Sequence, residues 1–301
     1  MLSVLIDPVL PVFAILAIGY VSGRSGLLGP DEARAVNRVA MSIFLPIFIF
    51  RAMALAPWPD FEIRPLAAYL LAEIVLYSLG FLIARRAFKL PPAEALLIGF
   101  CGIFANNAYY GLPIAQFLYG EDQILPITAV IMLDAVVAFG GTMVALETMA
   151  GRAAGASAGL VLRRILGLPL IWALAAGAAF GIADWPLPAP ADTFTGFAGQ
   201  AASPVALLAM GVILSSTSLR PDTVAVLATV VKVVVFPLVL WGLLVTLAPN
   251  TRPDLYLLAG AGPTGAMALS LALLYGVRTQ AIMQVSVFTA AATLLTLAWL
   301  A

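Results

Sequence analysis

The chain has 301 residues, of which 63% are hydrophobic and only 10% are charged, and its formal net charge is zero. A soluble domain is nearer one half apolar, so this composition excludes a soluble globular protein and indicates a polytopic membrane protein. One cysteine excludes an internal disulfide, and the lack of histidine excludes histidine metal sites and histidine proton relays.

Ten apolar stretches follow one another along the chain, each of roughly the 17–25 residues needed to cross a bilayer as a helix. They run over 5–22, 38–56, 65–84, 94–119, 123–147, 162–182, 195–217, 222–247, 254–275 and 279–300. The first has no basic residues before it and no cleavage signature after it, so we interpret it as a span and not as a signal peptide. The short connections predict an all-α membrane protein without an appended soluble domain.

A small-residue linker at 151–160 divides the chain into a first repeat, 1–150, and a second repeat, 161–301. Each half holds five stretches, and this odd number means that the halves cross the membrane in opposite directions. Loops after odd-numbered stretches contain eleven Lys and Arg residues, against three on the opposite side. This bias predicts that the linker is cytoplasmic and that both termini lie outside the cytoplasm. We expect the protein to lie in a bacterial-type inner (plasma) membrane.

Residue spacing within the two halves supports a duplication. Four positions of the first half have a partner at the same spacing in the second: Pro11 with Pro169, Gly19 with Gly177, Pro46 with Pro204, and Ala105 with Pro263. Chance is the alternative, because the chain has 21 prolines, but constant spacing across the set favours an inverted repeat. The last pair lies where two apolar stretches are interrupted by residues that disfavour a helix.

These two breaks predict a binding site in the middle of the membrane. Non-helical backbone survives at that depth only where protein buries it or where it lines a wet cavity. A half-helix that starts there presents unpaired N–H groups and a positive dipole end, which favour an anion. Asn106 and Asn107 add amide donors, although either can serve only as a cap of the break. The candidate substrate-binding residues are Asn106, Asn107, Gly262, Pro263, Thr264 and Gln200.

Three ionisable residues, Glu73, Asp134 and Lys232, lie deep in the apolar stretches. A charge at the centre of a membrane helix costs about 2.5–3.5 kcal/mol, so each requires a partner or a water path. Glu73 and Lys232 occupy nearly equivalent repeat positions and are candidates for a buried pair. The pair is either a permanent ion pair or a coupling site, in which Glu73 takes up a proton or Lys232 attracts an anion. Asp134 is either a hydrogen-bonded structural carboxyl or a second proton site.

One set of residues carries a resemblance to a known family: Pro11, Gly19 and Tyr20; Asn106 with Gly111, Leu112, Pro113, Tyr119 and Gly120; and Pro263 with Tyr275 and Gly276. The set resembles the auxin efflux carrier family, which includes PIN-type plant exporters and bacterial carriers of malonate and other organic anions. The resemblance implies two inverted five-helix repeats with the fourth and ninth helices broken and crossed. It also implies a scaffold of spans one, two, six and seven, a transport domain of spans three to five and eight to ten that moves in an elevator mechanism, and a homodimer.

The chain departs from its plant relatives at Ala105, because their proline precedes the asparagine of the fourth span. Alanine neither removes a backbone donor nor clashes with the preceding turn as proline does. The first break must therefore depend on Asn106, Asn107 and Gly111.

The sequence lacks the motifs that other functional classes require. The sequence has no His-Glu-x-x-His, nucleophile-and-base or Walker motif, so we expect neither an enzyme nor an ATP-driven pump, and neither a cofactor nor a metal. A gated anion channel and a membrane sensor remain alternatives, but deep charges of unequal sign favour a carrier. The sequence predicts a secondary transporter of a small organic anion, an auxin-like acid or a dicarboxylate, without a nucleic acid partner. A proton and a sodium ion are the candidate coupling ions, and uniport is the alternative to coupling.

Overall fold

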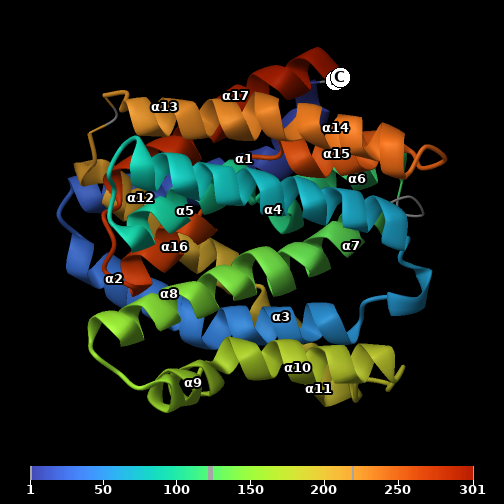
Figure 1. Ribbon diagram of the computed structural model, residues 1–301, viewed down its shortest axis with the longest axis horizontal. Coiled ribbons are helices and arrows are strands. Elements are labelled where there is room, and N and C mark those ends of the chain that lie inside the picture. The colour runs from blue at the N-terminus through green and yellow to red at the C-terminus, as the bar shows by residue number, and fades with distance from the viewer. Residues whose placement is uncertain (1, 121–124, 219, 301) are drawn as a thin grey trace.

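The computed structural model describes residues 2–120, 125–218 and 220–300. All regular secondary structure within these ranges is helical (Figure 1). Five helices are long and apolar enough to cross a membrane: Pro30–Ala54, Ile63–Arg86, Leu125–Ala153, Ala189–Ser216 and Thr223–Leu247. A sixth is counted when Ala158–Leu166 and Pro169–Ile182, bent by 60°, are taken as one span. The prediction of an all-α membrane protein is confirmed, whereas the number of ten spans stays a prediction.

The helices of the first half are interrupted at several places. Their bounds are α1 Leu2–Arg24, α2 Pro30–Val39, α3 Leu45–Ala54, α4 Ile63–Arg86, α5 Pro92–Ile103, α6 Leu112–Tyr119, α7 Leu125–Leu133 and α8 Gly141–Ala153. Three π-helical segments, Ala40–Phe44, Asn107–Gly111 and Asp134–Gly140, connect α2 to α3, lead into α6, and connect α7 to α8. The helix α5 begins at Pro92, where a proline is favoured because the first helical N–H has no intrahelical partner.

The helices of the second half are also interrupted at several places. Its bounds are α9 Ala158–Leu166, α10 Pro169–Ile182, α11 Ala189–Gly199, α12 Ala202–Ser216, α13 Thr223–Val230, α14 Phe236–Leu247, α15 Pro253–Ala261, α16 Met267–Leu274 and α17 Gln280–Leu300. A further π-helical segment, Val231–Val235, connects α13 to α14. The side chains of Ser157 and Asp222 accept hydrogen bonds from backbone N–H groups at the starts of α9 and α13, which caps both helices.

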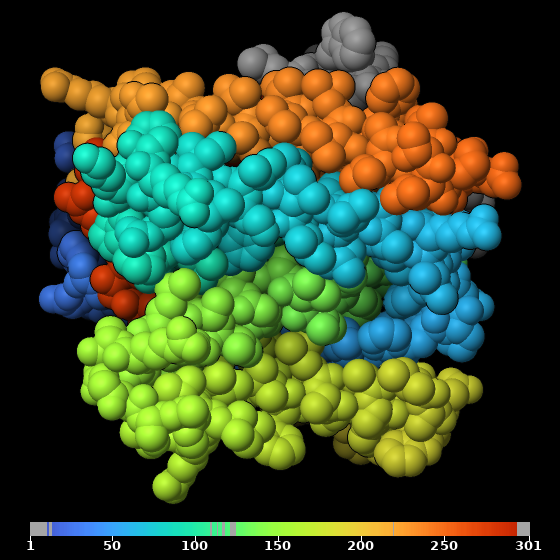
Figure 2. Space-filling view, viewed as in Figure 1, coloured from blue at the N-terminus to red at the C-terminus, as the bar shows by residue number. Residues whose placement is uncertain are grey.

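Two groups of helices pack together. In one group α1 packs against α12, and α3 packs against α10 and α11. In the other group α4 packs against α5 and α14, and α13 packs against α17. In the view of Figure 2, the segment of α7 and α8 lies between the α4–α5 part of the second group and the α10–α11 part of the first.

Two glycines at matching positions of the predicted repeat allow close approaches within the first group. A Cβ atom on Gly19 of α1 would lie 2.3 Å from the carbonyl oxygen of Leu208 in α12. A Cβ atom on Gly177 of α10 would lie 2.6 Å from the carbonyl oxygen of Phe50 in α3. Both distances are too short for any side chain, so glycine is required at each position for the helices to pack in this way.

Candidate functional site

The two interrupted segments meet in space. The helix α5 ends at Ile103 and the next helical turn begins at Asn107, while α15 ends at Ala261 and α16 begins at Met267. Across the junction the backbone N–H of Asn106 donates a hydrogen bond of 2.8 Å to the carbonyl oxygen of Pro263. Each break therefore supplies a partner for backbone that has left the helical pattern, as a low-dielectric environment requires.

Gly265 fixes the contact between the breaks. Its φ of +69° lies in the left-handed region, which residues with a side chain rarely adopt. A Cβ atom there would also lie 2.8 Å from the Cβ atom of Asn106 and 3.0 Å from its Cγ atom. The absence of a side chain at Gly265 thus leaves the room in which Asn106 sits.

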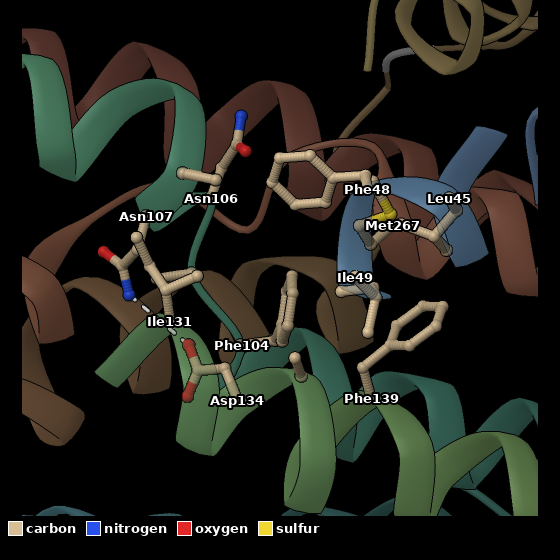
Figure 3. A pocket seen from close by; sticks show the side chains of 13 residues that line it. Leu45, Phe48, Ile49, Phe104, Asn106, Asn107, Ile131, Asp134, Phe139 and Met267 are labelled. Atoms are coloured by element: carbon tan, nitrogen blue, oxygen red, sulfur yellow. Dashed lines mark hydrogen bonds between the residues drawn. The ribbon is translucent and has the colours of Figure 1, made fainter. Parts of the chain in front are cut away.

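A cavity lies beside this junction (Figure 3). It contains about 490 Å³ not filled by protein atoms, part of it open to solvent. Its lining combines α3 with the first break, the Asp134 segment and the start of α16: Leu45, Phe48, Ile49, Phe104, Ala105, Asn106, Asn107, Ala108, Ile131, Asp134, Ala135, Phe139 and Met267. The cavity is therefore apolar except for two amides and one carboxyl, and it lies between α3 and the two interrupted segments.

The two asparagines point in different directions. Figure 3 shows the Asn106 amide on the Phe48 side of the break, whereas the Asn107 amide points toward Asp134. The Asn107 Nδ2 atom donates a hydrogen bond of 3.3 Å to Asp134 Oδ2. Among the described residues we find no hydrogen bond of the Asn106 amide, and this side chain is only half-buried. Asn106 is thus the amide that a ligand in the cavity can use.

Asp134 belongs to a buried cluster with Glu73 and Tyr69 of α4. These three side chains are exposed by only 3%, 2% and 0% of their surface. Asp134 is the strongest charged neighbour of Glu73, and Lys232 is the next. Within the described parts of the chain, no N–H or O–H group donates a hydrogen bond to either Glu73 oxygen or to Asp134 Oδ1, and the two carboxyl groups interact with each other. Such unpaired buried oxygens are rare and indicate a missing partner.

Lys232 lies at the other side of the junction and is fully buried. Its Nζ atom donates hydrogen bonds of 2.8 Å to the carbonyl oxygens of Ile103 and Gly260, at the ends of α5 and α15. The same atom lies 4.6 Å from the ring centroid of Phe236, a favourable cation–π distance. The ammonium group therefore binds the negative ends of both first half-helices.

Glu73 and Lys232 do not form the direct buried ion pair that the sequence suggested. No ion pair within 4.0 Å joins them in the described residues, where the salt bridges are Arg34–Asp31, Arg51–Asp192 and Arg252–Asp254. Lys232 influences Glu73 and Asp134 only through longer-range electrostatic attraction. Its donors are directed at backbone carbonyls, because these groups have no helical partner at the ends of α5 and α15.

The remaining predicted site residues lie outside the cavity lining. The Thr264 hydroxyl donates a hydrogen bond of 2.9 Å to the Cys101 carbonyl, and its N–H donates one of 3.2 Å to Thr289 Oγ1. Pro263 contributes its carbonyl oxygen to Asn106, and Gly262 is buried against Ala105. Gln200 is exposed between α11 and α12. The structure thus brings together Asn106, Asn107, Asp134, Glu73 and Lys232, and it leaves Gln200 apart.

Several residues of the site have no sequence signal. Phe48, Phe104 and Phe139 line the cavity, but in a membrane protein such residues are indistinguishable from ordinary core or lipid-facing residues. Asn107, Asp134 and Lys232 all lie in π-helical segments, which are frequent at functional sites. No residue pattern in the sequence predicts these segments. No group of three or more His, Cys, Asp and Glu side chains in the described ranges could hold a metal ion.

Comparison with known proteins identifies the family. Residues 4–300 match the family described as membrane transport protein. A protein of Rhizobium meliloti (strain 1021) named "Putative malonate transporter" is 27% identical over 222 residues, covering 71% of this chain and 67% of that protein. The "Uncharacterized transporter YfdV" of Escherichia coli (strain K12) is 24% identical over 293 residues, covering 93% and 91%. An "Uncharacterized transporter" of Methanothermobacter thermautotrophicus is 24% identical over 249 residues, covering 80% and 79%. Because the family match spans nearly the whole chain, the chain belongs to the membrane transport protein family, which is the auxin efflux carrier family.

Proposed function

We propose that the chain is a secondary transporter of a small organic anion, which binds in the cavity beside Asn106. The observation that carries the proposal is the distribution of helix ends at the junction. Lys232 binds the carboxyl-terminal ends of α5 and α15, which carry negative partial charge. The second halves of both broken segments begin at Asn107 and Met267, and both residues line the cavity. Positive helix ends thus face the cavity, and the Asn106 amide adds a donor for a carboxylate.

The substrate class follows from the same lining. Amide and helix-end donors occupy one part of the cavity, while the rest is apolar and includes Phe48, Phe104 and Phe139. A carboxylate with a small body fits this arrangement. The relative named as a malonate transporter supports a short dicarboxylate, and the aromatic lining supports an auxin-like aromatic acid as the second candidate.

Elevator-type alternating access is supported by where the cavity lies. Leu45, Phe48 and Ile49 come from α3, in the packing group that would form the scaffold. The other lining residues come from the interrupted segments, from α7 and from the Asp134 segment, which would form the transport domain. The matched packing of Gly19 and Gly177 agrees with an inverted repeat. In this proposal the scaffold also forms a homodimer, and both termini lie outside the cytoplasm. A gated channel and a membrane sensor are the alternatives.

Binding of carboxylates to the purified protein tests the proposal. We expect one member of a panel of malonate, succinate, acetate and indole-3-acetate to raise the thermal midpoint and to bind saturably in calorimetry. The variant Asn106→Ala should lose this binding. The matched variant Asn250→Ala removes an exposed amide between α14 and α15 and should bind as the wild type does. Wild-type affinity in Asn106→Ala would refute the site.

Transport by proteoliposomes separates a carrier from a channel and a sensor. A carrier shows saturable uptake that is stimulated by unlabelled substrate on the opposite side, because loaded sites return faster. Uptake that never saturates would support a channel. Specific binding without any flux would support a sensor.

A further inference from the structure

The charges around Asp134 do not balance. Two buried carboxyl groups, Glu73 and Asp134, share one buried ammonium group, Lys232, and the Tyr69 hydroxyl is the other titratable group that interacts with them. These groups come from α4 and from the π-helical segments after α7 and α13. With both carboxyls ionised, the cluster would carry one uncompensated negative charge in a dry environment, which is strongly unfavourable.

The unpaired oxygens show where a compensating cation belongs. Both Glu73 oxygens and Asp134 Oδ1 are buried and accept no hydrogen bond from a donor in the described residues, while the two carboxyl groups lie close enough to interact with each other. A proton on one of the two carboxyls supplies an O–H donor that the other carboxyl can accept, as in other pairs of neighbouring buried carboxyls. One proton therefore corrects the charge and gives two of the unpaired oxygens a partner.

Asp134 also lies where a substrate anion would bind. Its side chain is part of the cavity lining, together with Asn106 and Asn107 (Figure 3). An anion in this cavity and an ionised Asp134 would repel each other across an apolar medium, in which charges interact much more strongly than in water. The hydrogen bond from Asn107 to Asp134 connects the carboxyl to the break that also carries Asn106. Because Asp134 lines the cavity, binding of an anion there and protonation of Asp134 should favour each other.

We propose that Glu73 and Asp134 take up one shared proton with each anion, so that the protein is a proton–anion symporter in which Asp134 senses the bound anion. This inference rests on the proposed function, since it assumes that the cavity binds the anion. The proton comes from water on the side to which the cavity is open, and it leaves with the anion on the other side. By thermodynamic reciprocity, the anion raises the affinity for the proton by the same factor as the proton raises that for the anion.

A proton fits this place better than a sodium ion. Sodium sites at broken membrane helices use unwound backbone carbonyls and the carboxyl-terminal ends of half-helices as ligands. Here the carbonyl oxygens of Ile103 and Gly260 are already bound by the Lys232 ammonium. Lys232 thus occupies two of the carbonyl ligands that a coupling sodium ion could use.

Calorimetry in buffers of different ionisation enthalpy tests the proposal on the purified full chain. The probe is the tightest binder among malonate, succinate, acetate and indole-3-acetate, at a pH where it is fully ionised. At pH values where the pair is ionised in the free protein, the wild type should take up one proton for each bound anion, and its affinity should fall about tenfold for each unit of pH increase. Addition of sodium should leave the affinity unchanged. Anion binding without proton uptake, or affinity that depends on sodium and not on pH, would overturn the inference alone.

Substitutions of the two carboxyl residues test where the proton binds. Asp134→Asn should reduce the proton uptake to near zero and remove the pH dependence of the affinity, because one carboxylate is then balanced by Lys232. Glu73→Gln should do the same, which gives a second test if one variant does not fold. Asp60→Asn changes an exposed carboxyl outside the cluster and should keep the uptake of one proton. Unchanged proton uptake in both cluster variants would contradict the inference. Failure of the whole panel to bind the wild type would instead refute the proposed function.

Discussion

The backbone N–H of Asn106 lies 2.8 Å from the carbonyl oxygen of Pro263, to which it donates a hydrogen bond. The two residues belong to the two interrupted segments, one in each half of the chain. Because a hydrogen bond in an apolar medium is costly to leave unmade, the breaks are expected to move as one unit. A change that displaces one break should therefore disturb the other, and with it the cavity beside Asn106.

Gly265→Ala should destabilise the junction and weaken anion binding. The left-handed backbone at this position costs a non-glycine residue about 1–2 kcal/mol. The added methyl group would also overlap the Asn106 side chain, at 2.8 Å from its Cβ atom. We expect a lower thermal midpoint and a loss of affinity of about tenfold or more, measured by calorimetry with the best-binding panel anion.

Gly276→Ala is the matched control for this variant. Gly276 has a similar φ of +65°, but a Cβ atom there meets nothing within 4 Å. It should lower the thermal midpoint through the same backbone strain and leave the affinity within twofold. Equal losses of affinity in both variants would show that the contact with Asn106 has no part in binding.

Lys232→Met should strongly destabilise the protein. The substitution keeps a long apolar side chain but leaves the carbonyl oxygens of Ile103 and Gly260 without a donor, and it leaves the nearby carboxyls without their positive neighbour. Removal of one partner from a buried charged set costs about 3–5 kcal/mol. The expected result is a large fall in the thermal midpoint in detergent.

Two further variants test whether Lys232 connects the ends of α5 and α15 or binds the substrate. Lys89→Met changes an exposed lysine and should leave the midpoint unchanged. Lys232→Met combined with Glu73→Gln should recover part of the lost stability, since one unbalanced carboxylate is then removed. If Lys232→Met abolished anion binding at wild-type stability, Lys232 would be a substrate ligand and not a bridge between helix ends.

The interruptions of the fourth and ninth stretches could be predicted because proline, glycine and asparagine act locally on the backbone. The deep positions of Glu73, Asp134 and Lys232 were equally visible, since a charged residue in an apolar run is conspicuous. The partners of Lys232 were not predictable. They are backbone carbonyls, which every residue has, and only the folded chain shows which two lack a helical donor.

The set of residues that line the site also could not be predicted from the sequence. Thr264 and Gln200 were candidates because polar residues near a break often face a ligand, yet one is bonded within the protein and the other is exposed outside the cavity lining. Phe48 comes from a helix far from the breaks in sequence and has no polar atom to distinguish it. Its role depends on the packing of α3 against the junction, which residue spacing does not encode.

Thr264→Val tests the assignment of Thr264 to the protein interior. Valine has nearly the same shape but cannot donate to the Cys101 carbonyl, so the hydrogen bond of 2.9 Å is lost. We expect a loss of stability of about 1 kcal/mol, in the range of one buried hydrogen bond, with the anion affinity within twofold of wild type. A loss of affinity of tenfold or more at unchanged stability would show instead that Thr264 contacts the substrate.

Ala135→Leu should block the cavity without a change of charge. Ala135 is 6% exposed and lines the cavity on the segment that begins with Asp134. A leucine there would extend into the space required by the anion, so we expect binding to be lost. Ala138 belongs to the same segment and is 3% exposed, but it lies outside the lining. Ala138→Leu should therefore show a similar overpacking penalty of about 1–3 kcal/mol while still binding the anion. Calorimetry on both variants separates the effects, because an anion that bound Ala135→Leu normally would have to bind in a different cavity.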